Sequence, residues 1–103
     1  MRDAVAFYAG FFPRYNRLLA EAGFAEAVAR IKAAFDAGDR AEAARRVPDE
    51  LMAAISAAGT AEQCRARVEA YRRSGIALPI ISPRAGGPDG KAMAIEAIRA
   101  CAP

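Results

Sequence analysis

Glycine and proline residues interrupt this chain of 103 residues at short intervals, so only short helices and strands fit between them. Gly23 and Gly38 each follow a segment whose apolar residues recur at helical spacing, which is typical of a glycine that ends a helix. In the second of these segments, Val28, Ile31 and Phe35 share one face. The pattern of residues in the first half of the chain therefore predicts five short helices, over residues 3–12, 14–22, 24–37, 39–46 and 48–54.

Three helix starts carry their own signals. Asp39 with Glu42 resembles a capping pair, and Pro48 suits a first helical position. Thr60 followed by Gln63 has the form of a capping box. These signals predict the beginnings of the helices near residues 40, 48 and 61.

The helix that follows Thr60 is predicted to be amphipathic. Its apolar face carries Cys64, Val68 and Tyr71, and arginines occupy another face. Gly75 marks its end. A last helix is predicted over 91–101, with Ala94, Ile95 and Ile98 turned inward.

One segment, residues 76–82, is typical of a β-strand. It is apolar on both faces, which favours a parallel strand buried on both sides, although Pro79 removes one ladder donor. Residues 55–58 are either the tail of a helix or a second short strand. We therefore expect an α/β, helix-rich fold with one or two short parallel strands, and a parallel strand needs neighbours that this chain is too short to provide.

Composition narrows the function classes. The apolar fraction of 54% is carried mainly by alanine, and a net charge of +3 is too mild to indicate a nucleic-acid partner. The chain has no histidine, which excludes Ser-His-Asp triads, Cys-His dyads and histidine-based metal sites. Charges interrupt every membrane-length window and no signal peptide is visible, so we expect a cytoplasmic protein without a membrane or nucleic-acid partner.

Residues 59–76 resemble a known family. The run GTAEQCRARVEAYRRSGI is similar to a segment near the C-terminus of the luciferase-like flavin-dependent oxidoreductases, with Ala61 where proline is common. Residues 4–8, 15–24 and 47–51 also resemble members of this family. The resemblance implies a flavin- or deazaflavin-dependent reductase or monooxygenase, with FMN or the deazaflavin coenzyme F-420 as its cofactor.

The resemblance also implies the C-terminal part of a (β/α)8 barrel, a fold that needs about 250 residues. We therefore expect residues 1–103 to form a single partial domain, with a helical region over 1–54 and the barrel's seventh and eighth strands and helices over 55–103. Such a chain is expected to be inactive alone and to bind no cofactor. Its expected partners are the missing barrel portion or a second copy of itself.

The loop after the predicted eighth strand is the candidate cofactor site. Active sites of barrels lie at this end of the strands, and the backbone at Gly86 and Gly87 can approach a phosphate, with Ser82 and Arg84 beside it. No catalytic residue and no metal ligand is assigned. The alternative is an ordinary turn between a strand and a helix.

Other candidates have structural alternatives. Thr60 is explained by its capping role, and Cys64 is expected to be buried rather than nucleophilic. The aromatic residues near the N-terminus either line a substrate pocket or pack in a core or interface. These are Phe7, Tyr8, Phe11, Phe12 and Tyr15. A second function class, a small helical interaction module without catalysis, therefore stays open.

Overall fold

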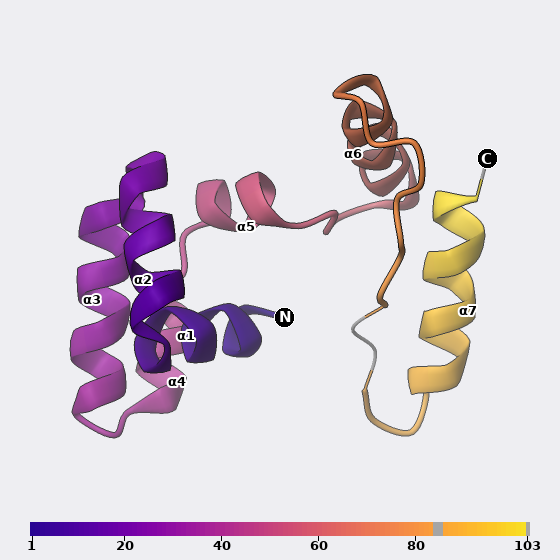
Figure 1. Ribbon diagram of the computed structural model, residues 1–103. Coiled ribbons are helices and arrows are strands. Elements are labelled where there is room, and N and C mark those ends of the chain that lie inside the picture. Colours follow the sequence, from indigo (N-terminus) through magenta and orange to yellow (C-terminus); the bar gives the residue numbers. More distant parts are fainter. Residues whose placement is uncertain (84–85, 103) are drawn as a thin grey trace. The chain divides into compact units, whose positions relative to one another are not determined.

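The computed structural model describes residues 1–83 and 86–102, and within them it contains helices and connecting loops (Figure 1). The elements follow in the order α1 (Arg2–Phe11), α2 (Pro13–Leu19), a π-helical turn η1 (Ala20–Phe24), α3 (Ala25–Asp36), α4 (Arg40–Arg45), α5 (Asp49–Ile55), α6 (Ala61–Arg73) and α7 (Gly90–Cys101). The contacts divide the chain into two compact units, Met1–Ile55 and Ser56–Pro103. None of the described helices is both long and apolar enough to cross a bilayer.

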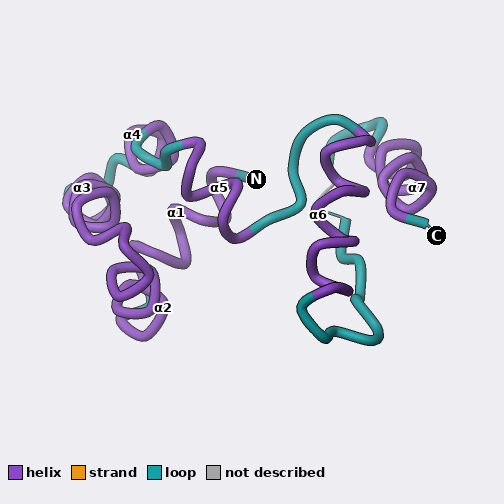
Figure 2. Tube along the Cα trace, turned by 90° about the horizontal axis from the view of Figure 1, so that it is seen from above, coloured by secondary structure: helices purple, strands orange, loops and turns teal. Residues whose placement is uncertain are grey.

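The first unit is held together by α1, α3 and α4, which all contact one another (Figure 2). The core of this unit, to which α2 and α5 also contribute, is small and rich in alanine. Its buried members are Ala6, Ala9, Leu19, Val28, Ile31, Ala43, Ala44, Val47, Leu51 and Met52. Because alanine buries little area, the helices must approach closely to exclude water.

Close approach is visible at Gly10, on the buried face of α1. A methyl group placed on its Cα would lie 2.5 Å from Phe35 Cγ and 2.7 Å from Phe35 Cβ on α3. Only glycine fits this crossing without a shift of one helix.

The helix ends of the first unit confirm most of the predicted signals. Gly23 and Gly38 have φ values of 102° and 80°, in the left-handed region that favours glycine. Asp39 Oδ1 accepts a 2.8 Å hydrogen bond from the Glu42 backbone N–H and so caps α4. The Glu42 side chain does not return this bond, because the Asp39 N–H donates to the Ala34 carbonyl. Arg2 of α1 donates to the Val47 carbonyl and pairs with Asp49, which ties α1 to the segment before α5 and to the first residue of α5.

The second unit consists of α6 and α7 with their flanking segments. The predicted capping box of α6 is confirmed: Thr60 Oγ1 accepts from the Gln63 N–H at 3.2 Å, and Gln63 Oε1 accepts from the Thr60 N–H at 2.8 Å. Val68 is buried, and Cys64 and Tyr71 are half-buried on the same face of α6. On α7, Cys101 is buried whereas Ile95 and Ile98 are exposed, so the predicted inward face is wrong for these two isoleucines.

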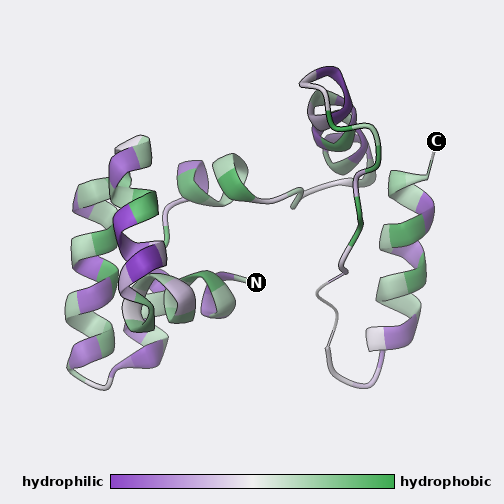
Figure 3. Cartoon of the chain, in the orientation of Figure 1, coloured by the Kyte–Doolittle hydropathy of each residue, from purple (hydrophilic) through white to green (hydrophobic). Residues whose placement is uncertain are grey.

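The predicted α/β fold, the end of a (β/α)8 barrel with one or two parallel strands, is wrong: the described residues contain no strand. Residues 76–82 form a non-helical segment that leaves Leu78 79% and Ile80 87% exposed. Figure 3 shows this hydrophobic stretch after α6. In the predicted strand, the Ile76 N–H donates to the Tyr71 carbonyl, and Pro79 has no N–H. In residues 55–58, the other possible strand, the Ala57 carbonyl accepts from the Cys64 thiol. A parallel strand forms only where a neighbouring strand pairs with its backbone N–H and C=O groups. The apolar pattern of residues 76–82 does not supply such a neighbour.

Candidate functional site

The first unit has a shallow depression where α1, α3 and α4 meet. It is lined by Asp3, Ala6 and Phe7 of α1, Phe35 of α3 and Arg40 of α4, and its volume is about 230 Å³. The guanidinium carbon of Arg40 lies 5.2 Å from the centre of the Phe35 ring, a cation–π contact that fixes the long arginine side chain. The depression thus presents two phenyl rings with a carboxylate and a guanidinium.

An aromatic face extends from this depression along α1 into α2. We define it as Phe7, Tyr8, Phe11, Phe12 and Tyr15. The rings of Phe7 and Phe11 stack with centroids 5.3 Å apart, and those of Tyr8 and Tyr15 meet edge to face at 5.0 Å. Each of the five side chains is 36% exposed or more, and Phe11 reaches 58%. The five predicted aromatic residues therefore form one surface, of which Phe7 also lines the depression.

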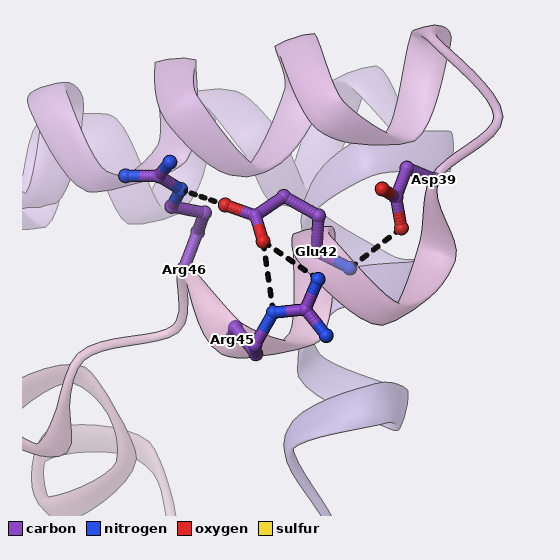
Figure 4. Close-up of polar contacts among 4 residues, drawn as sticks. All are labelled: Asp39, Glu42, Arg45 and Arg46. Carbon is purple, nitrogen blue, oxygen red and sulfur yellow. Dashed lines mark hydrogen bonds and ion pairs between the residues drawn. The ribbon is translucent and has the colours of Figure 1, made fainter.

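A cluster of charged side chains lies on α4 and at its C-terminal end (Figure 4). Glu42 Oε2 accepts from Arg45 Nε at 2.8 Å, and Glu42 Oε1 accepts from Arg46 Nε at 2.5 Å. The hydrogen bonds from Arg45 and Arg46 hold the pKa of the Glu42 carboxyl below its usual value. Because the three side chains satisfy one another along a single short helix, we assign them a role in stabilising α4.

In the described part of the predicted cofactor loop, no atom lies within 4 Å of a Cβ placed on Gly86 or Gly87. Ser82, Gly86 and Gly87 are exposed, and Arg84 lies outside the described residues. The Gly87 carbonyl accepts a 3.1 Å hydrogen bond from the Gly90 N–H, which forms the turn that leads into α7. The structure thus gives Gly87 a place in a turn and brings no described side chain toward it.

The depression between α1, α3 and α4 does not fit a flavin or deazaflavin. Pockets that enclose cofactor-sized ligands usually span about 300–1,000 Å³ and bury most of the ligand surface. The depression is smaller than this, and the aromatic face beside it is open. No group of acidic, histidine or cysteine side chains suited to hold a metal occurs among the residues described.

Sequence reasoning missed the depression because its members come from three helices. The spacing of Asp3 and Phe7 on one helical face gave a partial signal. Phe35 was predicted on the apolar face of a helix with Val28 and Ile31, and no role was predicted for Arg40. Their contact follows from the packing of α3 against α4.

Comparison with known proteins identifies a family. Residues 1–78 match the luciferase-like monooxygenase family, and this span includes α1 to α6 and ends before Ser82. Comparisons with curated proteins and with solved structures gave no match. Since the matched span covers most of the 103 residues, the chain belongs to the luciferase-like monooxygenase family.

Proposed function

We propose that this chain is the C-terminal, helical part of a flavin- or deazaflavin-dependent luciferase-like oxidoreductase, acting in the cytoplasm as a reductase or monooxygenase. The observation that carries the proposal is the family match over residues 1–78. In such enzymes the reduced ring of FMN or the deazaflavin coenzyme F-420 supplies the hydride or activates oxygen, and the protein orients the ring and excludes water.

The chain alone is proposed to be inactive. The depression of about 230 Å³ cannot bury a three-ring cofactor, and Ser82, Gly86 and Gly87 lie exposed. The remaining portion of the enzyme is therefore proposed to supply the enclosing part of the cofactor pocket. The exposed apolar side chains Leu78 and Ile80 support this, since neighbouring exposed apolar side chains can form part of a contact surface.

Cofactor titration tests this proposal. Purified chain is titrated with FMN and, separately, with the deazaflavin, and ring fluorescence and oxygen consumption with the reduced cofactors are followed. We expect no saturable change in fluorescence and no turnover above the cofactor-only rate. Saturable binding of one cofactor per chain, together with turnover that Ser82→Ala or Gly87→Val reduces, would overturn the proposed dependence on the remaining portion of the enzyme.

A second candidate function is association with another copy of this chain through the aromatic face. At roughly 200 Å² per aromatic side chain, the five residues leave about 400 Å² of apolar surface exposed. A standard interface buries about 800 Å² per partner, and aromatic residues are enriched at its core. The aromatic face thus has the area and composition of the core of a symmetric dimer.

Sedimentation velocity over a range of concentrations tests this association. We expect a dimer that Phe11→Ser weakens roughly tenfold or more, because buried aromatic residues dominate such interfaces. Ile80→Ser is the matched control, since it removes an exposed apolar side chain of the other unit. A chain that stays monomeric throughout, or one whose dimer is lost in Ile80→Ser but not in Phe11→Ser, would exclude the aromatic face as the contact.

A further inference from the structure

The second unit holds the two cysteines of the chain at facing ends of its two helices. Cys64 lies in the first turn of α6, and Cys101 is the last residue of α7. Both are free thiols, with Cys101 buried and Cys64 half-buried. They are far apart in sequence, so nothing in their spacing indicates that they meet.

A hydrogen bond beside the cysteines brings these helix ends together. Arg65 Nε donates to the Ala100 carbonyl at 3.1 Å. Arg65 follows Cys64 directly, and Ala100 precedes Cys101 directly. The packing of α6 against α7 within this unit agrees with that contact (Figure 2).

The thiols also influence each other electrostatically. Burial raises the pKa of the Cys64 thiol, and the neighbouring Cys101 raises it further. Such an effect falls with distance, so it agrees with two sulfur atoms in one neighbourhood. The Cys64 thiol now donates to the Ala57 carbonyl, with 3.1 Å between sulfur and oxygen. A bond from this sulfur to Cys101 would replace that weak hydrogen bond.

We propose that Cys64 and Cys101 form a reversible, redox-sensitive pair whose disulfide joins the start of α6 to the end of α7. The oxidant is a low-molecular-weight disulfide such as oxidised glutathione. One cysteine thiolate attacks a sulfur of this disulfide, which forms a mixed disulfide and releases one glutathione thiolate. The other cysteine thiolate attacks the protein sulfur of the mixed disulfide, which forms the Cys64–Cys101 bond and releases the second glutathione.

The reaction balances without a further reagent. Two cysteine thiols are oxidised, one small disulfide is reduced to two thiols, and the two cysteine protons end on the glutathione sulfurs. The new bond closes residues 64–101 into a covalent loop that contains the exposed segment 76–82. In a reducing compartment the two cysteines remain thiols, and they form the disulfide when the glutathione pool becomes oxidised.

Equilibration of the full chain in glutathione buffers of increasing oxidation tests the pair. Free thiols are then blocked with iodoacetamide, and the products are mapped by peptide mass spectrometry. We expect a monomer that has lost two hydrogen atoms, with the peptides of Cys64 and Cys101 linked within one chain. Glutathione retained on both cysteines, or only links between chains, would overturn the proposal.

Two matched variants, Cys64→Ser and Cys101→Ser, extend the test. Each is expected to stop at a single glutathione adduct. The thermal midpoint of the wild-type second unit should rise by about 10 °C on oxidation, because loop closure restricts the unfolded chain. Neither variant should show this rise. Two results would contradict a disulfide that fits the folded structure. One is an equal rise of the thermal midpoint in either variant. The other is no rise in wild-type chain whose mass shows that the disulfide has formed.

Discussion

At the scale of single residues, Gly10 decides how closely α1 approaches α3. We predict that Gly10→Ala destabilises the first unit by about 2 kcal/mol, because the added methyl group overlaps both Cβ and Cγ of Phe35. Chemical denaturation followed by circular dichroism measures the loss. Gly86→Ala is the control, since a methyl group there meets no atom within 4 Å, and it should leave stability unchanged. A Gly10→Ala variant as stable as the wild type would refute the close crossing.

Glu42 gives the first unit a predicted pH dependence. The pKa of the Glu42 carboxyl is lower in the folded state than in the unfolded state. The contribution of Glu42 to the free energy of unfolding is therefore present above the pKa of the unfolded state, and it is lost as the pH falls through the pKa of the folded state. Glu42→Gln should therefore make the free energy of unfolding fall less steeply between neutral and acid pH. Urea titrations at a series of pH values measure the slope. Glu50→Gln, an exposed carboxylate of α5 without an ion pair among the described contacts, should keep the wild-type slope.

Residue types predicted local geometry where the cause is local. Gly23 and Gly38 end helices because positive φ suits glycine, and Asp39 caps α4 through a hydrogen bond three residues away. The need for glycine at position 10 was not visible, because Phe35 is remote in sequence and only the crossing of two helices brings it near. The same holds for Arg40 over the Phe35 ring.

At the scale of the elements, the capping box sets the start of α6. We predict that Thr60→Ala lowers the stability of the second unit by about 1 kcal/mol, because the N–H of Gln63 loses its acceptor. Thr60→Ser keeps the hydroxyl and should restore most of this loss. Helicity and thermal midpoints from circular dichroism compare the two variants. Equal losses in both would show that the threonine methyl group, not the hydrogen bond, carries the effect.

The helices could be predicted from sequence more fully than the segments between them. Helices α3, α4, α6 and α7 all form where periodicity and caps predict them, since an α-helix satisfies its own backbone. A β-strand needs a neighbouring strand to satisfy its backbone hydrogen bonds, and the apolar pattern of residues 76–82 does not indicate whether such a neighbour exists. The predicted cofactor residues Ser82, Arg84, Gly86 and Gly87 depended on that strand, so their role stays a prediction.

At the scale of the whole molecule, the division after Ile55 predicts two folding units. The buried cluster of the first unit lies wholly within residues 1–55. We therefore predict that a chain of residues 1–55 retains the helical circular dichroism of these residues and unfolds cooperatively. A non-cooperative, largely unstructured peptide would show that the first unit depends on residues 56–103.

The central claim is that this member of the luciferase-like monooxygenase family is helical and pairs no strand of its own over residues 76–82. Amide hydrogen exchange of the intact chain, read residue by residue by NMR, tests it most directly. We predict that the amides of residues 77, 78 and 80–82 exchange at nearly the rate of an unstructured peptide, whereas those of α1 and α3 near Ala9 and Ile31 are protected. Protection of residues 76–82 equal to that of α3, with chemical shifts typical of a β-strand, would contradict the account.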